Sequence, residues 1–301
     1  MTFSEYDLPG RASELLAAQK DALEDHGEDC DQYDIPSDEI LGIYDDFASL
    51  PSPDNFGTYT DGLLTTMEKL ATGGYSTGQT DGSTGVASSV LDLTISAGDE
   101  VDDWTGKGAD QFNIWTDGWK TGVSNQFAAT VALRILLNAE AAVWTGVLKD
   151  LDDLSNAATK AMKAVTECNG DDVTIALSVA TAVVGIAAAI PTAGTSLSLV
   201  AVAGAGLGVA STGMQVYDAA SKPEPKISSC CPRCCIDDVK DALKDIKTHT
   251  REAEEKIAKD LDKNINIING AWSEFCKPAP ALGSVPRKNV HGYDGLGSFP
   301  G

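Results

Sequence analysis

A single apolar stripe, from Phe112 to Val165, constrains the fold of this chain more than any other feature. Along it an apolar or small residue recurs every three or four positions with few gaps. This spacing is that of one face of an α-helix, and it predicts a helix from Gly108 to Glu167, about 90 Å long if unbroken. Three glycines inside it are the expected sites of kinks, namely Gly118, Gly122 and Gly146.

Shorter helical patterns flank this stripe. Helices are expected over 11–25, 36–50, 54–72, 86–101 and 236–275. Ser37 is the expected N-cap of the second. The last carries a stripe formed by Val239, Leu243, Ile246, Ala253, Ile257, Leu261, Ile265, Ile268 and Trp272. Since no strand pattern competes, the predicted fold class is all-α, an elongated helical bundle built on a long antiparallel helix hairpin.

The chain is expected to divide into five consecutive segments. These are acidic N-terminal helices over 1–77, a helical hairpin over 78–168, an apolar helical hairpin over 169–222, a cysteine cluster with the C-terminal amphipathic helix over 223–276, and a tail over 277–301. The tail is predicted to be disordered because it is too rich in Pro and Gly to pack.

The charge of the chain excludes one class of partner. There are 45 acidic and 22 basic residues, for a net charge of −23, which repels nucleic acid over most of the surface. Residues 1–50 alone hold 14 acidic side chains against Arg11 and Lys20. We interpret this region as a solvated face rather than a docking surface.

The stretch DDWTGKGADQF, from Asp102 to Phe112, separates two helical patterns. A pattern that stops at Asp103 and resumes by Gly108 requires a reversal or a kink. Gly106 can take a positive φ without a Cβ clash, as helix turns often require. Trp104 would then lie at the tip, where its ring can cover the apolar seam or contact a partner.

These residues resemble a known family. Trp104, Thr105 and Gly106, followed by Ala109 and Phe112, look like the motif of the Trp-x-Gly proteins that type VII secretion systems export from actinobacteria and other Gram-positive bacteria. The resemblance covers residues 86–167. It implies a helical hairpin with the motif at its turn, exported folded and often as a dimer. The motif positions expected to form the turn and bind a partner are Trp104, Gly106, Phe112, Trp115 and Trp119.

One departure from the family bears on export. Members often carry a Tyr-x-x-x-Asp/Glu signal, and no tyrosine here has an acidic residue four positions later. The signal then lies on a partner chain, or this protein is not itself the targeting subunit. The start MTFSEYDLPG lacks the basic and apolar parts of a secretory signal, so the expected location is secreted or in the cell envelope, without a cleaved signal peptide.

A second long feature, Val173 to Val216, contains no charged residue. Pro191 and Gly194 divide it into two segments, each near the length of a membrane crossing. It resembles the hydrophobic head of α-helical pore-forming toxins, but two apolar helices can equally form the buried centre of a bundle. The residues expected to insert, if it enters a membrane, are Val184, Ile186, Ile190, Pro191, Leu197 and Leu199.

Seven cysteines include the cluster CCPRCC. The candidates for disulfides are Cys168, Cys230, Cys231, Cys234, Cys235 and Cys276. Bonds from the cluster to Cys168 or Cys276 are the first expectation, because those two residues flank the same helices; free thiols and a metal site are the alternatives. A closed zinc site needs four ligands, and a second C-x-x-C or an H-x-x-x-H is absent.

Catalysis has little support in the sequence. His26, His249 and His291 belong to no metal or nucleophile motif, and no glycine loop binds phosphate. We therefore expect a non-enzymatic protein without cofactor or metal, which acts by helix-mediated assembly with itself or a smaller helical partner. The alternative is a membrane-inserting, pore-forming protein that uses residues 173–216. A third class is a cytosolic scaffold or an immunity-like binder.

Overall fold

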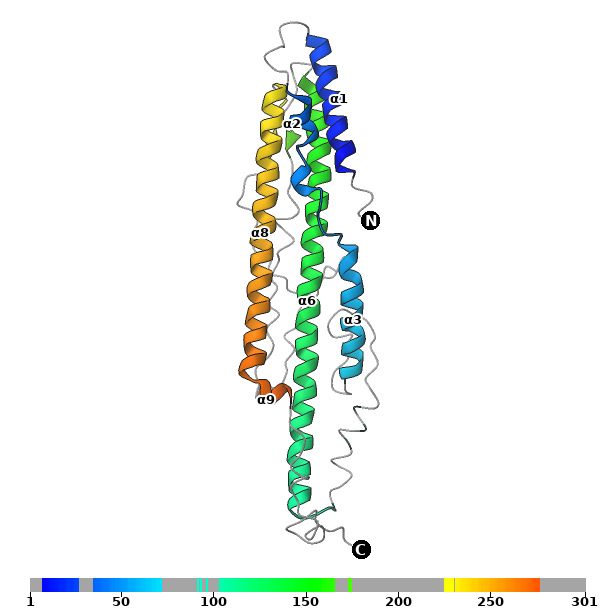
Figure 1. Ribbon diagram of the computed structural model, residues 1–301, viewed down its shortest axis with the longest axis vertical. Helices are drawn as coiled ribbons and strands as arrows, with labels where there is room; N and C mark the ends of the chain where they lie inside the picture. The colour runs from blue at the N-terminus through cyan, green and yellow to red at the C-terminus, as the bar shows by residue number, and fades with distance from the viewer. Residues whose placement is uncertain are drawn as a thin grey trace. The chain divides into compact units, whose positions relative to one another are not determined.

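The computed structural model describes residues 7–26, 35–71, 91, 93, 96, 103–165, 173–174, 225–229 and 231–276. This part of the chain is predominantly helical (Figure 1). Its helices are α1 (Leu8–His26), α2 (Ser37–Leu41), the short 3-10 helix η3 (Asp45–Phe47), α3 (Asp54–Leu70), α6 (Lys107–Ala164), α8 (Pro232–Gly270) and α9 (Trp272–Phe275). Two strands of two residues, β1 (Val173–Thr174) and β2 (Lys226–Ile227), pair antiparallel, with Val173 opposite Ile227.

The long predicted helix is confirmed. Helix α6 runs for 58 residues, and the three glycines expected to kink it all lie inside it. Buried members of its stripe include Val123, Phe127, Leu151 and Met162. A glycine costs about 1 kcal/mol in a helix interior, whereas each buried large side chain contributes about 1.5–3 kcal/mol. Burial of the stripe therefore outweighs the glycines.

Contacts divide the chain into two units, each drawn from three stretches. The first unit comprises Met1–Thr58, Asn138–Gly185 and Met214–Ile257, and the second comprises Tyr59–Leu137, Ile186–Gly213 and Ala258–Gly301. Helices α3, α6 and α8 each contribute residues to both units. The expected division was instead into consecutive segments, which stays a prediction.

In the first unit, α1 and the short elements that follow it pack with parts of α6 and α8. Arg11 of α1 binds α6 through Asp152, with 2.5 Å between Nη2 and Oδ1, and through Asn156, with 3.0 Å between Nη1 and Oδ1. The fully buried large side chains of the first unit include Leu15, Ile35, Ile40, Leu151, Leu154, Met162, Ile227, Ile236 and Ile246. These come from several elements, so this unit has a core of its own.

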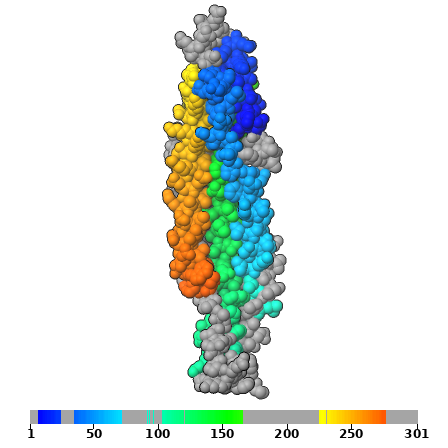
Figure 2. Space-filling model, in the orientation of Figure 1, coloured from blue at the N-terminus to red at the C-terminus, as the bar shows by residue number. Residues whose placement is uncertain are grey.

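Basic side chains of α8 hold α2 and η3 in the first unit. The Glu39 carboxylate accepts hydrogen bonds from Arg233 at 2.6 Å and Lys240 at 2.5 Å. Lys247 pairs with Asp46 and its Nζ lies 5.4 Å from the centre of the Phe47 ring. In Figure 2 the blue surface of this segment lies against the yellow start of α8, in agreement with the ion pairs.

The second unit has a smaller described core. Met67 and Ala71, from α3 and the residue after it, pack with Phe127 and Val131 of α6. Two α6 side chains also bind the backbone of α9. Asn125 Nδ2 donates to the Glu274 carbonyl at 3.0 Å, and Gln126 Nε2 donates to the Phe275 carbonyl at 2.7 Å.

Three sequence expectations differ from the structure. The helix predicted over 36–50 is interrupted: α2 ends at Leu41, and the Ser37 N-cap is wrong because Pro36 precedes the helix and makes no side-chain cap. The last helix begins at Pro232 rather than Ile236, since a proline in the first helical position sacrifices no hydrogen bond.

The third difference concerns the apolar stretch, whose first residues, Val173 and Thr174, form a strand instead of a helix. The candidate membrane-inserting residues and the tail over 277–301 lie outside the described residues. Of the helix expected over 86–101, residues 91, 93 and 96 are described, and they are helical.

Candidate functional site

The Trp-x-Gly turn starts helix α6. Gly106 has a φ of 116°, a conformation that side chains with a Cβ rarely adopt, so the predicted positive φ is confirmed. The Gly106 carbonyl accepts the Asp110 N–H at 3.0 Å, which places Gly106 directly before the first helical turn. The antiparallel course of the helices on either side of this turn stays a prediction.

Four aromatic rings form a continuous series beside this turn, and we call Trp104, Phe112, Trp115 and Trp119 the aromatic ladder. Successive ring centroids lie 5.7, 6.0 and 6.1 Å apart. Phe112, Trp115 and Trp119 share one face of α6 because they are spaced by three and four residues, and Trp104 reaches Phe112 across the turn. The structure therefore brings together all the residues of the predicted motif.

The aromatic ladder is only partly covered. Each of its four rings is half-buried. The Trp115 indole Nε1 is buried and meets no hydrogen-bond acceptor in the described part of the chain. A buried donor without an acceptor costs about 1–3 kcal/mol, so this site lacks one polar contact that would stabilise it.

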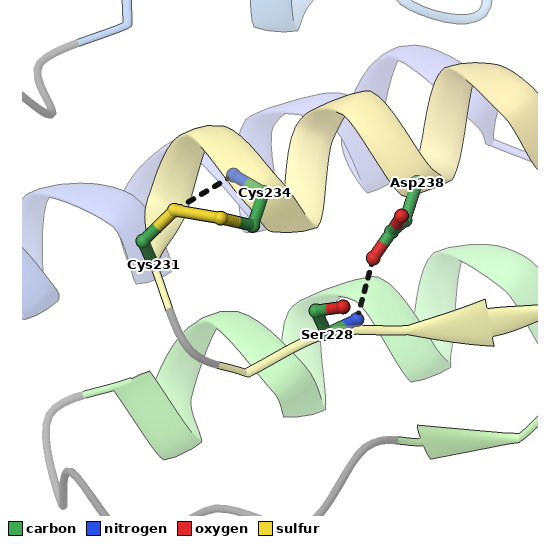
Figure 3. Close-up of a disulfide and its surroundings, with 4 residues drawn as sticks. All are labelled: Ser228, Cys231, Cys234 and Asp238. Carbon is green, nitrogen blue, oxygen red and sulfur yellow. Dashed lines mark hydrogen bonds between the residues drawn. A yellow bond between two sulfur atoms is a disulfide. The ribbon is translucent and has the colours of Figure 1, made fainter.

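A second candidate site, the cysteine turn, comprises Cys231–Cys235 at the start of α8. The disulfide joins Cys231 to Cys234, whose Cα atoms are 5.2 Å apart (Figure 3). This pairing differs from the expected bonds to Cys168 or Cys276. The Cys276 thiol is exposed and unbonded, while Cys168 and Cys230 lie outside the described residues.

The local pairing has a simple geometric reason. The first turn of a helix brings residues i and i+3 to the same face, and the resulting Cα separation is within the range of a disulfide. Cys235, one residue further, points into the core: it is fully buried, and its Sγ lies 3.6 Å from the Ala158 carbonyl of α6. The sequence signal that could have identified this pairing is C-P-R-C just before the helical pattern, with Pro232 suited to the first position of a helix.

Three acidic or phenolic groups of the first unit have shifted pKa values. The hydrogen bond from Lys240, with further help from Arg233, lowers the pKa of Glu39. Burial, followed by the nearby Glu140 carboxylate, raises the pKa of Glu254. Burial raises the pKa of Tyr44 to about 12. Glu39 of α2 is bound by side chains of α8, and Glu254 of α8 lies near Glu140 of α6; sequence reasoning identified none of these groups.

Among the residues that the structure describes, no group of three or more His, Cys, Asp or Glu side chains could hold a metal ion. In the same part of the chain one helix, α6, is long and apolar enough to cross a membrane by length and composition, and 39% of the relevant window is buried. Core helices of soluble proteins satisfy the same criterion.

No protein-family model, curated protein or solved structure matches the chain.

Proposed function

We propose that this chain is a non-enzymatic helical protein of the Trp-x-Gly type, secreted or envelope-associated, that works by assembling with itself or with a smaller helical partner. The observation that carries the proposal is the positive φ of Gly106 directly before α6, with the Trp104 ring against Phe112 of that helix. The proposed architecture is a helical bundle in which the segment before Trp104 runs antiparallel to α6.

The aromatic ladder is the proposed contact surface. Its four rings are half-buried rather than packed fully in a core. A partner helix laid on this face of α6 would cover them. Large, half-covered aromatic side chains with one polar group are typical of the residues that dominate binding energy at interfaces.

One other feature supports a role outside the cytosol. Disulfides persist in oxidising compartments and are rare in reduced ones, and the cysteine turn holds one. The missing Tyr-x-x-x-Asp/Glu signal is a departure from the family, and the proposal places that signal on a partner chain. On this proposal the complex, rather than the single chain, is the exported species.

Assembly is tested by measuring the mass of the protein in solution over a wide concentration range, alone and with candidate helical partners. Trp119→Ala is expected to weaken association at least tenfold, because large aromatic side chains dominate binding energy at interfaces. Ile114→Ala is the matched control, since Ile114 is on the same helix and 65% exposed but, one residue before Trp115, lies on a different face of α6. Equal effects of both substitutions, or no association at any concentration, would contradict the proposed surface.

Export is tested in cells that lack the type VII ATPase. Loss of release is the expected result, and unchanged release would exclude this route.

The membrane alternative is tested by leakage from liposomes, with and without residues 173–216. Leakage that requires this segment would favour a pore-forming protein over an assembly protein.

A further inference from the structure

The cysteine turn combines three features that a purely structural disulfide does not need. Cys231 lies directly before the first residue of α8, Pro232, and the Cys234 backbone N–H donates to Cys231 Sγ at 3.0 Å. The Cys231 carbonyl also accepts the Cys235 N–H at 3.0 Å. The sulfur of Cys231 therefore receives a backbone donor at the positive end of a helix dipole, the environment that favours a thiolate.

Both sulfurs belong to residues that remain partly accessible. Cys231 and Cys234 are half-buried, whereas Cys235 is fully buried. Access by a thiol is a requirement for exchange, because the attacking sulfur must reach a sulfur of the disulfide. The chain thus presents one cysteine pair at the surface and directs the adjacent thiol into the core.

The fold around the turn is held by contacts other than the disulfide. Arg233, between the two cysteines, pairs with Glu39 of α2 at 2.6 Å. The Ser228 N–H, just after β2, donates to Asp238 Oδ2 at 2.8 Å (Figure 3). Cys235 is anchored against α6. A disulfide that encloses only two residues also restricts the unfolded chain less than a long-range one.

We propose that Cys231 and Cys234 form a reversible thiol–disulfide exchange site whose co-reactant is a thiol, with Cys231 as the residue that forms the mixed disulfide. An external thiolate attacks Cys231 Sγ, the bond to Cys234 breaks, and Cys234 leaves as a thiolate that takes up a proton. A second external thiolate then attacks the external sulfur and releases Cys231. Two thiols become one disulfide, and the cysteine pair gains two electrons and two protons.

This site is independent of the aromatic ladder and of the proposed assembly. Reduction would leave Arg233 bound to Glu39 and Cys235 packed on α6, so the first unit keeps its fold in both redox states. The exchange therefore converts the disulfide at the start of α8 into two thiols while the helix stays folded.

The experiment uses the full chain, equilibrated with glutathione redox buffers or with a peptide that contains two thiols, and then blocked by alkylation. Trypsin cleaves after Arg233, so Cys231 falls in one peptide with Cys230 and Cys234 in another with Cys235, and tandem mass spectrometry locates the label on each sulfur. The expected result is reversible reduction of this pair, with Cys235 unmodified and circular dichroism unchanged. Reduction by glutathione alone identifies a small thiol as the co-reactant, and reduction by the peptide alone identifies a protein thiol.

Two variants assign the roles of the sulfurs. In Cys234→Ser the mixed disulfide with glutathione on Cys231 is expected to form at least tenfold faster than that on Cys234 in Cys231→Ser. Equal rates would overturn the assignment of Cys231. Where a variant fails to fold, the wild-type protein decides: a pair that stays oxidised in both buffers, or that is reduced only as the helical signal is lost, overturns the exchange site.

Discussion

Replacement of Gly106 by alanine is the most direct test of the turn that starts α6. Alanine normally stabilises a protein when it replaces glycine, because it restricts the unfolded chain. At a φ of 116° the added Cβ instead meets a sparsely populated backbone conformation, which costs about 1–3 kcal/mol. We expect Gly106→Ala to lower the free energy of unfolding by that amount and the melting temperature by about 2–4 °C per kcal/mol.

The matched control is Gly62→Ala. Gly62 lies inside α3, and a Cβ added there would meet nothing within 4 Å, so the substitution should stabilise the protein by about 0.5–1 kcal/mol. The same change of one methyl group is thus expected to have opposite signs at the two glycines. Urea denaturation followed by circular dichroism measures both. If Gly106→Ala stabilises the protein as Gly62→Ala does, residue 106 has an ordinary backbone conformation and the argument for the turn is wrong.

Three further predictions concern side chains of the first unit. Leu151→Ala should cost about 2–5 kcal/mol in chemical denaturation, because Leu151 is fully buried in α6, whereas Leu133→Ala should cost less than about 1 kcal/mol. Since the pKa of Glu39 is lowered, its contribution is present above its ordinary pKa and lost on acidification; Glu39→Gln should cost about 0.5–1 kcal/mol at pH 7 and nothing in acid. Burial and Glu140 raise the pKa of Glu254, so its charged form destabilises the fold at neutral pH. Glu254→Gln should therefore raise the free energy of unfolding at pH 7 and leave it unchanged below pH 4.5. A variant that is less stable than the wild-type protein at pH 7 would contradict this environment.

The helices that could be predicted from the sequence are those whose period is long and regular. The stripe of α6 specifies one helical face over many turns, so neither its glycines nor its neighbours could change the assignment. Residues 36–50 have no such redundancy. There α2 stops at Leu41, and the buried Ile40, Tyr44 and Phe47 reach the core from a short helix, a turn and η3. Tertiary packing, which a local pattern does not contain, decided that segment.

The two candidate sites show the same distinction between local and distant information. The positive φ of Gly106 follows from the need for a turn at that point, and a turn is a local property. The Cys231–Cys234 pairing is local too, but it became visible only when α8 was found to begin at Pro232. With the helix expected to start at Ile236, the cysteines lay in a linker, where nothing favoured pairing with a near neighbour over a distant one.

Periodicity establishes which residues share a face, and it leaves open what covers that face. The stripe of α8 is buried up to Ile257, yet Leu261, Ile265 and Trp272 continue the same period and are 37%, 43% and 59% exposed. Along α6 the aromatic ladder is likewise regular and only half-buried. An apolar helical face that extends beyond the segment covering it is exposed to water at a cost in free energy. Binding of a second helix over the ladder would therefore be favourable. For this reason the assembly proposal depends on measured association and on the contrast between Trp119 and Ile114, rather than on the helical pattern itself.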